Sequence, residues 1–213
     1  MLKIWGRASS VNVQKVLWAA DELGLGYEHI TVGGRYGGND TPDYRAMNPN
    51  GLVPVLQESD GSTHWESNSV VRYLAAKYDA EGRSLWLADP GLRSQADRWM
   101  DWASSLLGEP MRALFWGFVR DPVNADLNAM AKAEVQAANY WSRLDAHLGA
   151  NVEKGRPFVA GDRLTIGDIP AACQLQRWLN FPITRPQLPY LLAWHARMTE
   201  RPGYQAHVMP PME

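Results

Sequence analysis

The chain has 213 residues, of which 21 are basic and 23 acidic; the charges are interspersed, which argues against a nucleic-acid-binding surface and against an acidic tail. Its single cysteine, Cys173, excludes an internal disulfide framework and a zinc site built from several cysteines. The longest apolar patch, residues 113–119, is too short to span a bilayer, and the N-terminus lacks the apolar core of a secretory signal. We therefore expect a cytoplasmic protein.

Residues 1–80 alternate between strand-like and helix-like patterns. A first strand is followed by apolar residues at helical spacing, then by glycines that end the helix and by a second strand. A strand, helix and strand within about thirty residues form a βαβ unit with a parallel strand pair. Two short strands and a second apolar helix follow, so the predicted order is βαβ–ββα. The predicted strands are residues 2–5, 27–32, 54–57 and 63–65.

The second half of the chain shows only helical patterns. We expect an α/β domain over residues 1–80, a linker over 81–90 and an all-α helical bundle over 91–213. The segment Thr165–Asp168 fits a helix-starting capping box, which we interpret as structural. The predicted helices of the bundle are residues 92–119, 125–148, 167–179 and 188–198.

The segment from Asn48 to Leu56 combines a turn with a short strand that Pro54 opens. A proline at this place can be trans at the edge of a sheet, or cis, and the spacing favours neither. A cis bond would turn the backbone N–H and C=O of Val53 outward, where an extended ligand could form two β-type hydrogen bonds.

An acid and a hydroxyl, Glu66 and Ser67, precede the second helix of the α/β domain. They can be a solvated acid and a helix N-cap. Alternatively, the N-terminus of the helix can attract a carboxylate while Glu66 pairs with an ammonium group. A ligand with an α-amino acid end would satisfy both groups.

Three polar residues, Ser9, Ser10 and Asn12, lie between the first strand and the first helix. One serine can simply cap the helix. Alternatively, a hydroxyl at this place can donate to a bound thiolate, which lowers the pKa of the thiol from about 8.5 and supplies more nucleophile. No cysteine stands here, so thiol chemistry must use the sulfur of the ligand. The histidines show no paired metal-ligand spacing, and we expect no metal.

Four segments together resemble a soluble glutathione transferase of the theta, phi or nu type, and the resemblance spans nearly the whole chain. It implies a thioredoxin-like α/β domain followed by a helical domain, glutathione as co-substrate, conjugation to small hydrophobic electrophiles, a role in detoxification, and a homodimer. The segments are residues 10–16, residues 48–54, the pair Glu66–Ser67 and the box Thr165–Asp168.

The resemblance also implies roles for individual residues. Ser10 matches the position that activates the thiol, with Asn12 assisting and Ser9 beside it. Val53, before a cis Pro54, matches the residue that binds the cysteinyl backbone of glutathione, and Glu66 and Ser67 match those that hold its γ-glutamyl end. Leu52 stands where many relatives carry lysine or glutamine, so Asn50 or Arg35 is expected to bind the glycyl carboxylate instead.

The helical domain is expected to supply an apolar wall for the electrophile, which in this family lies between the domains. Two other functions compete with conjugation: a glutathione-dependent reductase of disulfides or peroxides, and a non-catalytic binding or assembly domain. A hydroxyl at Ser10 and the pair Glu66–Ser67 weigh against the non-catalytic alternative. The residues expected in the wall are Trp102, Met111, Arg112, Trp116 and Trp178.

Overall fold

The computed structural model describes residues 1–212 and divides into two compact units. Unit 1 comprises Met1–Ala88 and Gly203–Pro210, and unit 2 comprises Asp89–Pro202 with Pro211 and Met212. The expected linker over residues 81–90 therefore belongs largely to unit 1, where Leu85 is buried.

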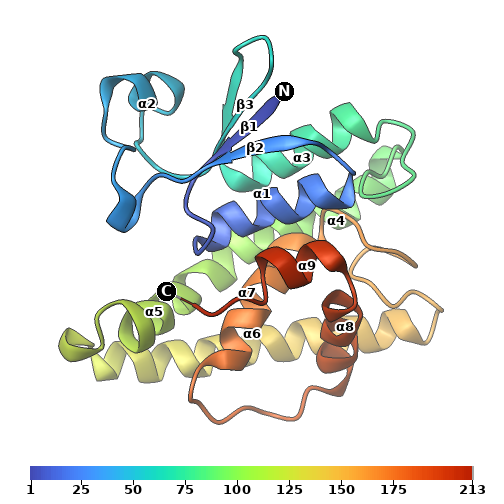
Figure 1. The fold of residues 1–213 in the computed structure, drawn as a ribbon. Coiled ribbons are helices and arrows are strands. Elements are labelled where there is room, and N and C mark those ends of the chain that lie inside the picture. Colours follow the sequence, from blue (N-terminus) through green and yellow to red (C-terminus); the bar gives the residue numbers. More distant parts are fainter. Residues whose placement is uncertain (213) are drawn as a thin grey trace. The chain divides into compact units, whose positions relative to one another are not determined.

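Unit 1 is built on a four-stranded mixed sheet in the order β2-β1-β3-β4, and Figure 1 labels β1, β2 and β3 of this sheet. β1 and β2 are parallel, whereas β3 is antiparallel to both β1 and β4. This arrangement confirms the predicted βαβ–ββα order of a thioredoxin-like domain, including the parallel pair that the first helix connects. The strands are β1 (Leu2–Trp5), β2 (Tyr27–Ile30), β3 (Val55–Gln57) and β4 (Thr63–Trp65).

Two long helices of unit 1, α1 and α3, pack against each other (Figure 1). α1 (Val11–Glu22) is buried on most of its surface, and α3 (Ser67–Tyr78) buries the predicted apolar stripe. Between β2 and β3 the chain forms a 3₁₀ turn, η1 (Gly34–Tyr36), and a short helix, α2 (Pro42–Met47), that the sequence pattern did not predict. Thr41 caps α2 and proline occupies its first position, which stabilises so short a helix.

The C-terminal segment returns to unit 1 through the short helix α9 (Pro202–His207). Tyr204 is fully buried and packs edge-on against Trp18 of α1, with ring centroids 4.9 Å apart. His207 Nε2 lies 2.8 Å from a carboxylate oxygen of Asp21. These contacts join residues 203–210, which lie within the expected helical domain over residues 91–213, to the α/β unit.

Unit 2 is helical, and the single helix expected over residues 92–119 is interrupted. Two π-helical segments, η2 (Ala103–Leu107) and η3 (Trp116–Arg120), flank its middle part. No helix within residues 1–212 is long and apolar enough to cross a membrane. The remaining elements are α4 (Pro90–Trp102), α5 (Gly108–Phe115), η4 (Pro122–Asn124), α6 (Leu127–Val152), α7 (Asp168–Asn180) and α8 (Pro189–Thr199).

The predicted capping box surrounds the fully buried carboxylate of Asp168, at the start of α7. One oxygen accepts hydrogen bonds from the N–H and the hydroxyl of Thr165, at 2.9 and 3.0 Å. The other accepts from the N–H of Val159 and from Nε1 of Trp194, at 3.0 and 2.9 Å. The box therefore ties together a loop, α7 and α8, in keeping with a structural role.

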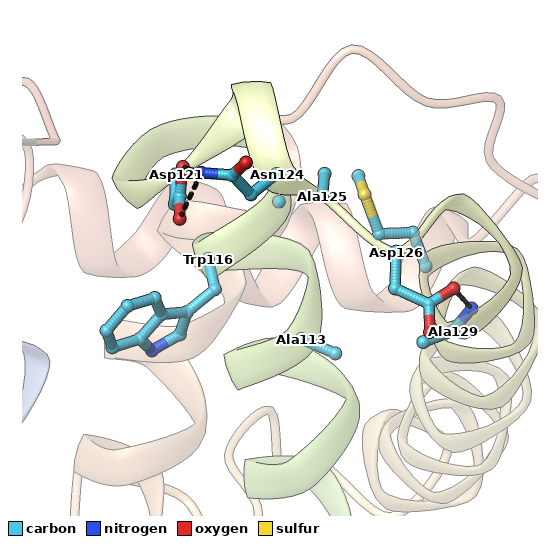
Figure 2. A pocket seen from close by; sticks show the side chains of 9 residues that line it. Ala113, Trp116, Asp121, Asn124, Ala125, Asp126 and Ala129 are labelled. Carbon is cyan, nitrogen blue, oxygen red and sulfur yellow. Dashed lines mark hydrogen bonds between the residues drawn. The ribbon is translucent and has the colours of Figure 1, made fainter.

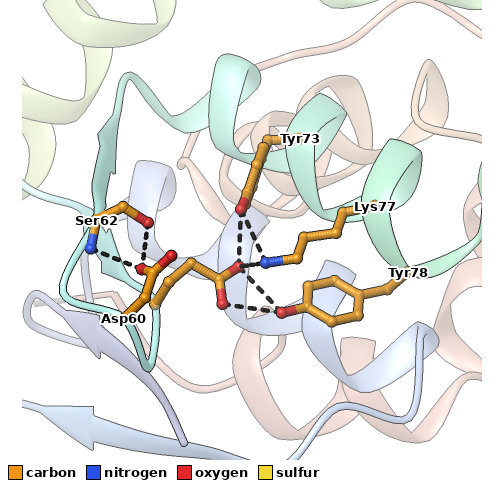
Figure 3. A network of polar contacts seen from close by, with 6 residues as sticks. Asp60, Ser62, Tyr73, Lys77 and Tyr78 are labelled. Atoms are coloured by element: carbon orange, nitrogen blue, oxygen red, sulfur yellow. Dashed lines mark hydrogen bonds and ion pairs between the residues drawn. The ribbon is translucent and has the colours of Figure 1, made fainter.

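A second polar network joins the end of β3 to α3 (Figure 3). The Glu58 side chain is 5% exposed and lies 2.8 Å from Nζ of Lys77. Its carboxylate also accepts hydrogen bonds from the hydroxyls of Tyr73 and Tyr78, at 2.9 and 3.0 Å. Burial alone would raise the pKa of Glu58, but the hydrogen bonds from Lys77, Tyr73 and Tyr78 outweigh it and lower the pKa below its ordinary value of 4.5.

We expect Glu58→Gln to lower the free energy of unfolding by about 1 kcal/mol at neutral pH, because the charge-assisted hydrogen bonds are lost. A carboxyl whose pKa is depressed in the folded state stabilises the protein above its unfolded pKa, and this contribution disappears as the pH falls through the folded value. The difference between parent and variant should therefore shrink below pH 4.5. Urea denaturation at several pH values measures it, and a constant difference would contradict this account.

Candidate functional site

The segment before β3 is held by buried polar side chains. The peptide bond between Val53 and Pro54 is cis, which decides between the two alternatives that the sequence left open. The carbonyl oxygen of Leu52 accepts hydrogen bonds from Nδ2 of Asn48 at 2.8 Å and from the hydroxyl of Tyr44 at 2.9 Å. Both donors are buried, so they fix the path of the chain into Val53.

The backbone of Val53 is open to a ligand. Val53 lies outside the strand pairing of β3, and among residues 1–212 its N–H and C=O form no hydrogen bond. The Leu52 side chain beside it is 61% exposed and carries no polar group. An extended peptide could therefore pair with this backbone as an added strand would.

Glu66 has a backbone conformation that is rare for a residue with a side chain. Its φ of 66° makes it the only non-glycine residue with a positive φ in the part of the chain described, residues 1–212. It occupies the N-cap position of α3 without a capping hydrogen bond, and its exposed carboxylate has no partner among those residues. Such outliers concentrate at ligand-binding sites. As the N-cap residue, Glu66 directly precedes the first N–H groups of α3.

Ser67 does not act as the N-cap that the sequence suggested. It is the first residue of α3, and its hydroxyl donates to Oδ1 of Asn12 at 3.2 Å. This hydrogen bond joins the N-terminal turns of α1 and α3, which lie far apart in the sequence.

Ser10 occupies the N-cap position of α1, but its side chain makes no capping hydrogen bond. The residue is 9% exposed, and within residues 1–212 its hydroxyl has no hydrogen-bond partner. A serine that only capped the helix would accept a hydrogen bond from an N–H of the first turn. The hydroxyl is thus available to donate to a ligand. Ser9 is half-buried in the preceding turn.

Lys15 is a buried residue of this site that the sequence reasoning did not single out. Its Nζ lies 2.9 Å from Oδ1 of Asn12 and 3.4 Å from both Oγ of Ser67 and Oδ1 of Asn68. The sequence does indicate the contact with Asn12, because Lys15 follows Asn12 by three positions and so shares a helix face with it.

The two residues expected at the glycyl end lie in different surroundings. Asn50 is exposed, and its side-chain amide donates to Oδ1 of Asn48 at 3.2 Å within the same turn. Arg35 is exposed in η1, donates to the hydroxyl of Tyr36 at 2.9 Å and lies over that ring.

The residues expected to form an apolar wall are only partly brought together in unit 2. Arg112 and Trp116 line one pocket of about 570 Å³, with Trp116 54% exposed. Met111 and Trp178 are buried in the helical core instead, and Trp102 packs edge-on against Trp99. The other lining residues of this pocket are Ser104, Ser105, Glu109 and Ala113.

A smaller hollow of about 240 Å³ lies between the end of α5 and the start of α6, and Trp116 also borders it (Figure 2). Its carboxylates have local partners: Asp121 accepts from Asn124, and Asp126 caps α6. Within residues 1–212 no group of three or more histidine, cysteine, aspartate or glutamate side chains could hold a metal ion.

Comparison with known proteins agrees with this arrangement. Residues 9–77 match the model of the glutathione S-transferase N-terminal domain, and residues 100–202 match that of the C-terminal domain. Glutathione S-transferase GstB of Escherichia coli is 39% identical over 213 residues, the full length of both chains. The chain belongs to the glutathione S-transferase family.

Other relatives of this glutathione transferase include a plant enzyme and a bacterial one of known structure. Glutathione S-transferase 3 of Zea mays is 28% identical and matches 97% of this chain and 93% of its own. The theta class glutathione S-transferase from Xanthomonas axonopodis pv. citri, solved with glutathione bound, is 45% identical, with a TM-score of 0.91. That comparison covers 100% of this chain and 99% of the other.

Proposed function

We propose that this glutathione transferase conjugates the thiolate of glutathione to small hydrophobic electrophiles, with Ser10 activating the thiol and Asn12 assisting. The observation that carries the proposal is the Ser10 hydroxyl, which lies at the N-terminus of α1 without a capping hydrogen bond. A free thiol has a pKa of about 8.5 and is mostly protonated at neutral pH. A hydroxyl donor and the positive end of the helix dipole both favour the thiolate and so lower this pKa.

The glutathione peptide is held by groups of unit 1. The cysteinyl backbone pairs with the open N–H and C=O of Val53, whose position Asn48 and Tyr44 fix through Leu52. The γ-glutamyl carboxylate binds at the N-terminus of α3 with Ser67, and its ammonium pairs with the carboxylate of Glu66.

The glycyl carboxylate binds Arg35 in preference to Asn50. Arg35 is an exposed cation, and a guanidinium can form two parallel hydrogen bonds with a carboxylate. The amide of Asn50 is neutral and has only two N–H donors, one of which is used within its own turn. Leu52 contributes no polar contact.

The electrophile is held on unit 2 by the pocket that Arg112 and Trp116 line. The exposed indole offers an apolar face to an aromatic substrate, and the guanidinium favours a substrate with an electron-withdrawing, partly negative group. Met111, Trp102 and Trp178 do not line this pocket and are left out of the proposed electrophile site.

Membership of the family supports three further proposals: a homodimer, a cytoplasmic location, and a role in detoxification. Sedimentation measurements on the purified protein would test the dimer.

The thiol-activating role is tested by Ser10→Ala, Ser9→Ala and Asn12→Ala. We expect Ser10→Ala to lower kcat/KM with a general aromatic electrophile at least tenfold, because a hydrogen bond to a charged group contributes about 1.5–3 kcal/mol. The binding of glutathione, measured by calorimetry, should change much less.

Ser9→Ala is the matched control and should retain the parent rate. Full activity of Ser10→Ala with loss of activity in Ser9→Ala would assign the role to Ser9. A parent protein that binds glutathione but turns over only a small disulfide would favour the reductase alternative, and one that turns over neither substrate would favour a binding domain.

A further inference from the structure

Lys15 lies where the two helix ends of the glutathione site meet. It is 5% exposed and donates to side chains from both helices, Asn12 of α1 and Ser67 of α3. The contact with Asn12, at 2.9 Å, is the shortest of these. A lysine is rarely buried to this extent unless polar partners compensate it. The position therefore indicates a specific role for the ammonium group.

The ammonium group determines which way the amide of Asn12 faces. A lysine has only N–H donors, and the hydroxyl of Ser67 also donates to the same atom of Asn12. That atom must consequently be the carbonyl oxygen. The NH₂ group of Asn12, which is an exposed residue two positions after Ser10, is then directed away from Lys15 and remains a donor for a ligand.

The charge of Lys15 also acts on the ligand itself. The proposed function places one anion, the thiolate, at the N-terminus of α1 and another, the γ-glutamyl carboxylate, at the N-terminus of α3. Lys15 bonds to residues of the first turn of both helices. A buried cation is screened less by water than an exposed one, so it adds to the two helix dipoles.

We infer that Lys15 is a positioning residue for catalysis: it holds Asn12 with its NH₂ group toward the thiol of glutathione and stabilises the thiolate by its charge. This inference rests on the proposed roles of Ser10 and Asn12. It assigns to a buried lysine a part of the thiol activation, beside the parts proposed for Ser10 and Asn12.

The test compares Lys15→Met with Lys77→Met. Both variants remove a lysine that makes polar contacts within unit 1, but Lys77 contacts Glu58 and not the glutathione site. The pKa of the bound thiol is measured from the ultraviolet absorbance of the thiolate and from the pH profile of kcat/KM. We expect Lys15→Met to raise this pKa by about one unit and to lower kcat at neutral pH about tenfold, and Lys77→Met to change neither.

A double-mutant cycle shows whether Lys15 acts through Asn12. The effects of Lys15→Met and Asn12→Ala on the thiol pKa should be less than additive when combined. An unchanged thiol pKa in folded Lys15→Met would overturn the inference, even if stability fell. If Ser10→Ala and Asn12→Ala are both fully active in the same assays, the proposed function fails instead.

Asn12→Asp keeps the inference testable should Lys15→Met not fold. This variant retains an oxygen for Lys15 but replaces the outward NH₂ group by a second oxygen. We expect the thiol pKa to be higher in Asn12→Asp than in Asn12→Ala, because a carboxylate repels the thiolate. An equal or lower value would show that the amide group does not face the thiol and would overturn the inference.

Discussion

Asp168→Ala is expected to lower the free energy of unfolding by about 4 kcal/mol or to prevent folding. The carboxylate is fully buried and accepts four hydrogen bonds, from Thr165, Val159 and Trp194. Removing it leaves buried donors without acceptors, and each costs about 1–3 kcal/mol. Denaturant unfolding followed by fluorescence measures the change.

Asp126→Ala is the matched control for this prediction. Asp126 also caps a helix, α6, but from an exposed position, where the loss of a cap costs about 1 kcal/mol. If Asp168→Ala and Asp126→Ala lowered the free energy of unfolding by similar amounts, the buried hydrogen bonds of Asp168 would not contribute more than an exposed cap does.

Burial raises the pKa of Asp168, and the hydrogen bonds that it accepts only partly oppose this. A carboxyl with a raised folded pKa binds its proton more tightly in the folded state, so its contribution to stability falls as the pH rises from the ordinary value of 3.8 toward the folded value. The asparagine side chain of Asp168→Asn does not ionise, so the stability of this variant lacks that dependence on pH. The stability advantage of the parent over Asp168→Asn should therefore decrease as the pH rises above 3.8.

Glu66→Gly is expected to weaken glutathione binding about a hundredfold while leaving the fold intact or slightly more stable. The binding loss follows from removal of the carboxylate proposed to pair with the ligand ammonium, a contact worth about 2–3 kcal/mol. The stability gain follows from φ of 66°, since glycine adopts this conformation without the strain of about 1–3 kcal/mol that a side chain incurs. Calorimetric titration and denaturant unfolding measure the two effects.

Two control variants, one at Glu66 and one at Gly61, separate the effect of the charge from that of the backbone conformation. Glu66→Gln keeps the shape and should weaken binding without a gain in stability. Gly61→Ala places a side chain at a φ of 90° where no atom obstructs it, so it should destabilise the protein by about 1 kcal/mol. Tight glutathione binding by both Glu66 variants would rule out the proposed contact with the ammonium.

Much of unit 1 could be predicted from sequence because its patterns are local. β1 and β4 have the predicted bounds, and the glycines after α1 end that helix as expected. α2 was missed because six residues show no apolar period and depend on a cap and a proline. The helix over residues 92–119 was predicted as continuous because a π-helical segment changes hydrogen-bond partners without changing the apolar character of the chain.

At Ser10 and Glu66 the residue type itself suggests the proposed chemistry, so the sequence was enough to name them as candidates. The site could not be predicted where the role depends on contacts between distant segments. Lys15 resembles any helix lysine until α3 brings Ser67 beside it. Likewise, the pattern of Ser67 fits an N-cap, but its hydroxyl bonds to Asn12 of another helix.

The packing of Tyr204 against Trp18 has a consequence for the order in which the protein forms during synthesis. Domains generally fold from the N-terminus onward as the ribosome extends the chain. The core of unit 1 includes the fully buried Tyr204, so this core is incomplete until residue 204 has left the ribosome. All of Asp89–Pro202 is made before that moment, so the α/β unit can complete its core only after most of unit 2 has been synthesised.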